Sequence, residues 1–138
     1  MTIAVTRDRA ARMRHVAHMR THAIPVDELP AVGGDDTGPT PHDLYDAAVA
    51  SGKALTELWY ANRKGLPVEG IEVSVDRDDA DERKGTYRLR ARLALTGTLT
   101  AAQRGELLAV AGKCPVHKLM TQATTEIVTE LALAPGAP

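Results

Sequence analysis

The chain has very few aromatic residues and a single cysteine. Among its 138 residues there is no Phe, one Trp and three Tyr, so we expect no platform of stacked aromatic side chains for single-stranded nucleic acid. Because Cys114 is the only cysteine, it has no partner for a disulfide within the chain. Any thiol chemistry must therefore use one cysteine alone or reach a second molecule.

The sequence also lacks an excess of charge and a long hydrophobic run. Its 17 basic and 18 acidic residues give a formal net charge of −1, which offers no attraction to nucleic acid or to an anionic membrane. No segment approaches the roughly 18 apolar residues of a membrane helix, and the first residues lack the apolar core of a signal peptide. We therefore expect a single soluble, cytoplasmic domain over residues 1–138, with no nucleic acid and no membrane as partner.

The most informative stretch predicts one long central helix over residues 41–64. Thr40 suits the N-cap, and Pro41 suits the first helical position. Asp43 lies in the first turn, where a carboxylate meets free backbone N–H groups and the positive end of the helix dipole. Gly65 ends the pattern.

The spacing of residues predicts how this helix is oriented. Lys53 and Glu57 are expected on a charged side that faces water, opposite the apolar and small residues. A second stripe of residues passes through Gly52. A glycine in a helix interior destabilises the helix by about 1 kcal/mol relative to alanine. Gly52 either permits close packing against another backbone or marks the absence of a side chain that is normally needed. A helix with two such stripes needs more cover than one small sheet provides, so we expect an obligate homodimer. The residues expected on the buried side are Leu44, Ala47, Ala48, Ser51, Leu55, Leu58 and Asn62.

The rest of the chain alternates between strand-like, irregular and helical patterns. We predict N-terminal strands over 1–24, a loop over 25–40, a hairpin over 69–96, helices over 100–122 and a closing strand over 124–133. The long loop is typical of a binding loop or of a crossing between subunits. His15, His18 and His22 invite a metal interpretation, but neighbouring strand residues point to opposite faces and no Cys or carboxylate completes a set. We therefore predict no metal and no cofactor.

Cys114 lies immediately before a short helical pattern that Pro115 begins. At the N-cap and beside Lys113, its thiol would meet two positive influences that favour the thiolate. A buried cysteine that acts as a small hydrophobic residue is the commoner situation. Both interpretations are open at this point.

Four motifs in order resemble the OsmC-like family of osmotically inducible proteins and organic hydroperoxide reductases. The resemblance covers roughly residues 20–130, and the order of the motifs is more specific than any one of them. It implies an α+β fold, two intertwined subunits with the central helices buried at the interface, and reduction of organic hydroperoxides by two cysteines. The motifs are GGDDTGPTP at 33–41, HDL at 42–44, YANRKG at 60–65 and CPVHK at 114–118.

The chain departs from the family at the decisive position. The family's peroxide-attacking cysteine lies ten residues beyond the position matched by His42, and that position is Gly52. The resolving cysteine matches Cys114. The family's acid near the start of the helix matches Asp43, or His42, where this chain lacks a carboxylate. The arginine that polarises the peroxide comes from the N-terminal strands, and Arg20 is the best candidate.

The loss of that cysteine leaves three functional hypotheses, because glycine offers no nucleophile. The first is a non-catalytic OsmC-like homodimer, a pseudoenzyme that binds a small hydrophobic ligand at the dimer interface. The second is a one-cysteine thiol peroxidase in which Cys114 attacks an organic hydroperoxide and an external thiol reductant regenerates it. The third is an ordinary hydroperoxide reductase in which Gly52 is an engineered or lineage-specific substitution.

Overall fold

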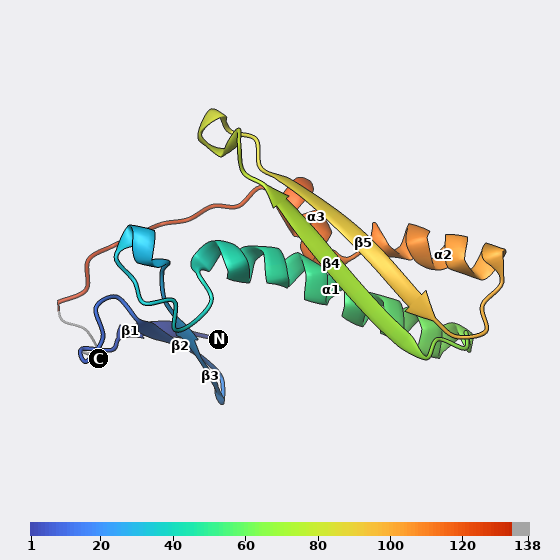
Figure 1. Cartoon of the computed structure of the whole chain (residues 1–138), viewed down its shortest axis with the longest axis horizontal. Helices are drawn as coiled ribbons and strands as arrows, with labels where there is room; N and C mark the ends of the chain where they lie inside the picture. Colours follow the sequence, from blue (N-terminus) through green and yellow to red (C-terminus); the bar gives the residue numbers. More distant parts are fainter. Residues whose placement is uncertain (134–138) are drawn as a thin grey trace.

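The computed structural model describes residues 1–133 and shows an elongated α+β chain built along one helix, as the sequence predicts (Figure 1). None of the helices within this range is both long and apolar enough to span a membrane. The elements are β1 (Ile3–Arg7), β2 (His15–Met19), β3 (His22–Val26), the 3-10 turn η1 (Pro30–Val32), α1 (Pro41–Lys64), β4 (Gly70–Asp78), the 3-10 turn η2 (Glu82–Lys84), β5 (Arg88–Thr96), α2 (Ala101–Ala111) and α3 (Pro115–Thr121).

The long helix α1 begins and ends at well-defined caps. The hydroxyl of Thr40 accepts a hydrogen bond from the backbone N–H of Asp43 at 3.1 Å, and the Asp43 carboxylate accepts one from the N–H of Thr40 at 3.0 Å. The capping box is therefore complete although its acid is Asp. At the other end Gly65 takes a left-handed φ of 66° and its N–H donates to the Ala61 carbonyl.

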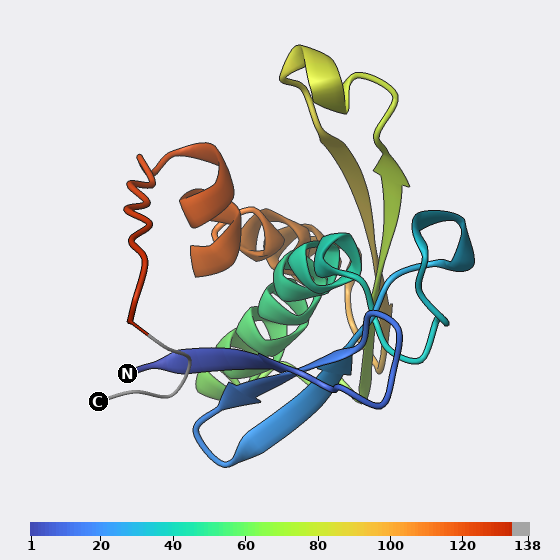
Figure 2. The same ribbon diagram turned by 90° about the vertical axis from the view of Figure 1, so that its left-hand side faces the viewer.

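Two antiparallel sheets lie at different places along α1. The hairpin of β4 and β5 pairs Ile71 with Leu95 and Val73 with Leu93, and β4 packs on α1 together with α2 and α3. The strands β1, β2 and β3 form a separate sheet in that order and pack chiefly on one another. Figure 2 shows this second sheet below α1, with the hairpin to the right of the helix.

The loop before α1 is held together by a buried carboxylate. Asp27 accepts hydrogen bonds from the hydroxyl of Thr37 at 2.5 Å and from the backbone N–H groups of Thr37 and Glu28. These donors lower the pKa of Asp27 to about 2. Gly34 packs so closely against the Glu28 carbonyl that a Cβ would lie 2.0 Å from its oxygen. The loop is therefore held in one conformation by its own hydrogen bonds and packing, and it fixes where α1 begins.

The orientation of α1 differs from the sequence prediction. The buried side chains are a row at every fourth position, Val49, Lys53, Glu57 and Ala61, which includes the charged residues expected in water. Leu55, expected in the core, is 69% exposed. The hairpin, α2 and α3 pack on α1, but Leu55 and Leu58 stay exposed within the single chain.

The predicted closing strand over 124–133 is not formed. These residues pair with no strand of the described chain, and all of them are exposed; Leu131 is 100% exposed. The alternating pattern of Ile127 and its neighbours needs a free strand edge and an apolar surface to pair with. The single chain does not bring either of them to this segment.

Candidate functional site

The centre of the candidate site is a contact between Gly52 on α1 and Cys114, the N-cap residue of α3. A Cβ placed on Gly52 would lie 2.8 Å from the Sγ atom of Cys114 and 3.4 Å from two carbon atoms of Val116. Cys114 is a free cysteine with an exposed fraction of 0%. The missing side chain of Gly52 therefore makes the space that the sulfur atom occupies.

The surroundings of Cys114 bear on the reactivity of its thiol. A thiol that attacks a peroxide must be reached by the substrate, and reactive cysteines are at least partly exposed. The Cys114 side chain makes no capping hydrogen bond, and the helix that it precedes has only seven residues. Its environment is that of a small hydrophobic side chain in a packed interior.

A buried lysine ties α1 to the segment that carries Cys114. The Nζ atom of Lys53 donates to the carbonyl oxygen of Ala111 at 2.7 Å, at the end of α2. The same atom lies 2.8 Å from Nδ1 of His117 on α3, and this nitrogen accepts because an ammonium group only donates. Lys53 follows Gly52 directly, so these bonds fix α3 against the helix where Cys114 meets Gly52.

A second buried charge lies one turn further along α1. Glu57 has an exposed fraction of 0%, and neither of its carboxyl oxygens has a hydrogen-bond donor. Burial raises the pKa of Glu57 to about 7, and the nearby charge of Lys53 acts in the opposite direction. The sequence predicted that both residues face water, although Val49 and Ala61 lie in the same row of α1 at a spacing of four.

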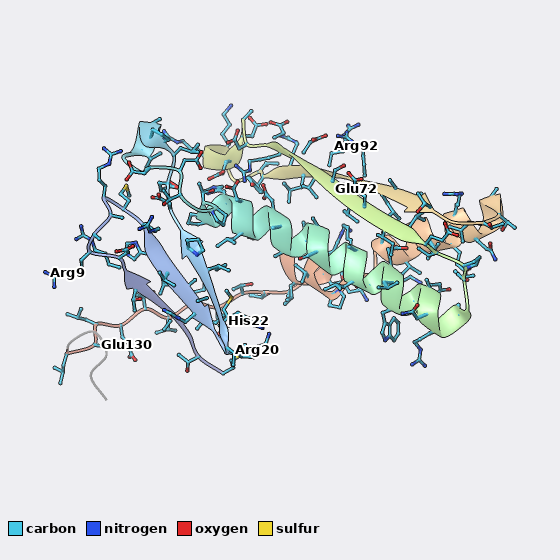
Figure 3. The ribbon with its side chains drawn as sticks, turned by 60° about the horizontal axis from the view of Figure 1, so that its bottom comes forward. Arg9, Arg20, His22, Glu72, Arg92 and Glu130 are labelled. Carbon is cyan, nitrogen blue, oxygen red and sulfur yellow. The ribbon has the colours of Figure 1, made fainter. Side chains whose placement is uncertain are left out.

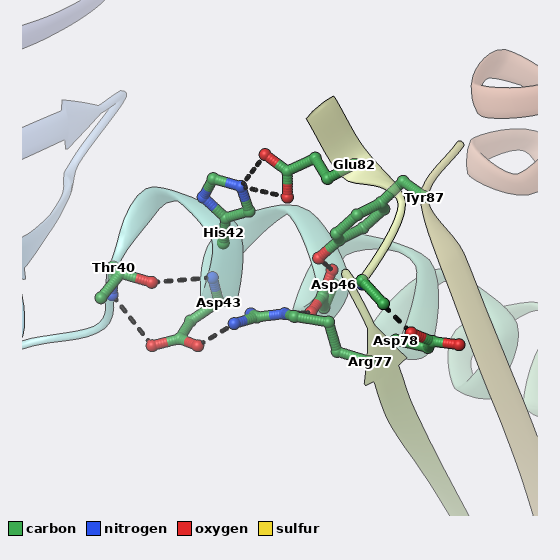
Figure 4. A network of polar contacts seen from close by, with 9 residues as sticks. Thr40, His42, Asp43, Asp46, Arg77, Asp78, Glu82 and Tyr87 are labelled. Atoms are coloured by element: carbon green, nitrogen blue, oxygen red, sulfur yellow. Dashed lines mark hydrogen bonds and ion pairs between the residues drawn. The ribbon is translucent and has the colours of Figure 1, made fainter. Parts of the chain in front are cut away.

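Asp43, the predicted acid, is occupied by structural contacts. Besides the capping bond, it accepts a hydrogen bond from Nη2 of Arg77 on β4 at 3.0 Å (Figure 4). The backbone N–H of Thr40 lowers the pKa of Asp43, and Arg77 adds to the effect. His42, on the same turn, places Nε2 3.0 Å from both carboxyl oxygens of Glu82.

Asp46 extends this polar network to the hairpin. It accepts from Nε of Arg77 at 2.6 Å and from the hydroxyl of Tyr87 at 2.7 Å. Burial, followed by the hydrogen bond to Asp46, raises the pKa of Tyr87 to about 12. Arg77 therefore binds two carboxylates of α1, and the network fixes the far end of the hairpin on the first turns of the helix. No motif in the sequence pointed to this pairing.

Arg20, the predicted peroxide-binding arginine, lies away from these groups within the chain. It occupies the turn between β2 and β3 with a left-handed φ of 56°, and its side chain is exposed beside His22 (Figure 3). Among residues 1–133, no hydrogen bond or ion pair joins Arg20 to another side chain. Its role at the site stays a prediction that depends on a second subunit.

An apolar groove runs beside the contact of Gly52 and Cys114. Its volume is about 590 Å³, and it lies between α1 and the end of α2. Trp59 and Leu55 expose most of their surface there. The hydrogen bond of 2.6 Å between the Tyr60 hydroxyl and Glu106 lies at its polar side. The lining residues are Leu55, Thr56, Trp59, Tyr60, Glu106, Ala109, Val110, Lys113 and Pro115.

Comparison with known proteins identifies the family. The sequence model described as OsmC-like protein matches residues 33–130. The chain belongs to the OsmC-like protein family. The resemblance seen in the motifs is therefore confirmed. A search of curated proteins found no match.

Solved structures confirm the OsmC-like fold. One from Psychrobacter arcticus, described as an osmotic stress induced and detoxification response protein, is 21% identical, with 86% of each chain covered and a TM-score of 0.71. An OsmC-like protein of unknown function from Vibrio cholerae is 20% identical, with 94% of this chain and 96% of that chain covered and a TM-score of 0.69. An organic hydroperoxide resistance protein from Bacillus subtilis is 21% identical, with 88% and 92% covered and a TM-score of 0.57. At these identities the likeness establishes the fold alone.

Proposed function

We propose that this OsmC-like protein is a non-catalytic homodimer that binds a small hydrophobic ligand beside Gly52. The observation that carries the proposal is the contact of Gly52 with the fully buried sulfur of Cys114. Reduction of a peroxide requires a thiolate in line with the O–O bond. Gly52 supplies no thiol, and Cys114 is fully buried beside α1, so no thiol of the chain meets this requirement.

The apolar groove supports the ligand-binding part of the proposal. Thr56 and Trp59 are the next two residues after Gly52 on the same stripe of α1, and Pro115 follows Cys114 directly. The groove therefore adjoins the position of the missing nucleophile. Its volume of about 590 Å³ is within the usual range for small-molecule sites, and its lining is mainly apolar.

The exposed surface supports the homodimer. The chain exposes 10375 Å², whereas a compact monomer of this mass exposes about 7,000 Å². The excess of about 3,400 Å² per chain is enough to supply one subunit's share of an obligate dimer interface, which buries about 2,000 to more than 5,000 Å² over both partners. Large apolar side chains contribute to it from several elements, among them Ile3, Val5, Leu55, Trp59 and Leu119. The separate N-terminal sheet and residues 124–133 lack packing partners within one chain.

A thiol-reactivity assay and a peroxidase assay test the proposal that the protein is non-catalytic. In native buffer, Cys114 should react with 5,5′-dithiobis(2-nitrobenzoic acid) far more slowly than in urea, because folding removes the sulfur from solvent. The wild-type protein should not consume cumene hydroperoxide above the blank with dithiothreitol as reductant. Consumption of peroxide together with oxidation of Cys114 would establish the one-cysteine thiol peroxidase instead.

A fluorescence titration tests the groove itself. Trp59 is the only tryptophan and lines the groove, so a bound neutral apolar probe, N-phenyl-1-naphthylamine, should quench its emission. Leu55→Asp, which places a charge in the groove, should weaken probe binding at least tenfold. Leu108→Asp is the matched control, because Leu108 is also exposed but lies outside the groove. Equal binding by the two variants would contradict the proposed location.

A further inference from the structure

A second hollow, away from Gly52, lies where the first turns of α1 meet the hairpin. Its volume is about 340 Å³, and five residues line it: Pro41, His42, Tyr45, Glu82 and Tyr87. Three of the five side chains are aromatic rings, and one is a carboxylate. His42 lies ten residues before Gly52, which is about 15 Å along the helix axis. The hollow is therefore distinct from the contact of Gly52 with Cys114, although Tyr45 and Tyr87 also line a larger cavity of about 950 Å³ that reaches Lys53 and His117.

The rings stand as adjoining walls. The centroids of Tyr45 and Tyr87 are 5.8 Å apart with 68° between the ring planes. Those of His42 and Tyr87 are 6.0 Å apart with 64° between the planes. Both pairs are edge-to-face contacts, so the three rings form one continuous aromatic surface beside the hollow that they line. Aromatic walls of this kind attract a cation by their quadrupoles, as in the cages that bind methylated ammonium groups.

The charges around the hollow also favour a cation. Nε2 of His42 holds both carboxyl oxygens of Glu82, which positions the carboxylate at the hollow (Figure 4). Asp43 and Asp46 both bind the guanidinium of Arg77, so two carboxylates share one positive side chain. This excess outweighs the half charge at the N-terminus of α1, which the capping box already satisfies.

We propose that this hollow binds a small quaternary ammonium compound of the choline class. A methylated ammonium group has no N–H to satisfy and is weakly hydrated, so aromatic walls with a single carboxylate suffice for it. A primary ammonium group would need several acceptors, and Tyr87 and Asp46 are already bonded to each other. No group of three metal-ligating side chains gathers among residues 1–133, so the donor set of a metal ion is not offered.

The test compares choline with its neutral isostere, 3,3-dimethylbutan-1-ol. Both are titrated into the full-length protein, and the ring resonances of the three tyrosines are followed by NMR. Choline should shift Tyr45 and Tyr87 with saturation and leave Tyr60 unmoved. The isostere should bind at least tenfold more weakly, because only the charge separates the two molecules. Added salt should weaken the binding of choline.

Variants separate the cage from a merely exposed patch. Tyr45→Leu and Glu82→Gln should each weaken choline binding about fivefold or more. Tyr60→Leu is the matched control, because this tyrosine lies on the same helix outside the hollow, and it should leave the affinity unchanged. Circular dichroism establishes that each variant is folded. Equal affinity for choline and the isostere, no saturable binding to the folded protein, or no effect of either cage variant would overturn the proposal.

Discussion

Gly52→Cys should form a disulfide with Cys114 and give the chain a peroxidase activity that the wild type lacks. A Cβ on Gly52 would lie 2.8 Å from the Cys114 sulfur, which is too close for two unbonded atoms. In a disulfide, however, each Cβ lies about 3 Å from the partner sulfur. At this distance two reduced thiols would be crowded, whereas a disulfide between the two residues nearly fits.

The two redox states of this variant should differ in stability. A crosslink across a loop of about 60 residues stabilises the fold by about 4 kcal/mol in the chain-entropy account, less any strain. In the reduced state the added side chain meets a sulfur with no free space around it, although replacing the glycine stabilises the helix by up to about 1 kcal/mol. Urea unfolding of oxidised and dithiothreitol-treated protein, each compared with the wild type, measures this difference.

The expected chemistry follows from the two adjacent sulfurs. The introduced thiolate attacks the outer oxygen of the hydroperoxide and the O–O bond breaks. The OH group stays on the sulfur as a sulfenic acid, and the remaining alkoxide takes a proton and leaves as the alcohol. The Cys114 thiol then attacks that sulfur, displaces water and forms the disulfide. A dithiol reductant regenerates both thiols. If Arg20 of a second subunit polarises the peroxide, Arg20→Ala in this background should lower the turnover, whereas Arg9→Ala should not.

Three further variants make this prediction decisive. Gly52→Ala adds only the Cβ and reports the steric cost alone. Gly52→Ser adds a side chain of similar shape that cannot form the disulfide. Gly52→Cys combined with Cys114→Ser keeps the nucleophile and removes the resolving thiol, so it should lose reductant-dependent turnover. A folded Gly52→Cys protein with neither the disulfide nor turnover would show that the family's chemistry does not transfer to this chain.

Local signals in the sequence were enough to predict the central helix and its ends. The N-cap residue Thr40, Pro41 and the terminal Gly65 act over one turn each, and the structure starts and stops α1 at these residues. The OsmC-like motifs placed Gly52 and Cys114 in one site, and the structure brings them together. These features depend on short-range geometry or on an order of motifs, which a single sequence contains.

The orientation of α1 could not be predicted because it depends on what covers each side of the helix. Counting apolar residues favoured the row of Leu55 and Leu58, which stays uncovered in the single chain. The hairpin and α2 instead bury Lys53 and Glu57, although charged residues in a sequence are expected to face water. The predicted closing strand is absent for a related reason, since residues 124–133 pair with no strand of the described chain. Apolar surfaces that stay exposed in the single chain look like a core in the sequence.

The stability of the fold should fall as the pH rises from about 4.5 to about 7, because of Glu57. Its carboxyl group is fully buried without a hydrogen-bond donor, and burial raises its pKa from 4.5 to about 7. The folded state therefore holds this proton more tightly than the unfolded state does. The contribution is complete below pH 4.5, is lost as the pH rises through about 7, and amounts to about 3 kcal/mol.

Variants of Glu57 should remove this dependence. Glu57→Gln cannot ionise, so its free energy of unfolding should lack the decrease that the wild type shows between pH 5 and 8. Glu57→Leu should exceed the wild type at pH 8 by about 2 kcal/mol or more, because it also removes two buried oxygens without partners. Glu72→Gln is the matched control, since Glu72 lies on the exposed face of β4. Urea unfolding at each pH measures all four proteins. If Glu57→Gln kept the wild-type slope, the proton would belong to another group, and the attraction of Lys53 would be strong enough to hold Glu57 ionised in the interior.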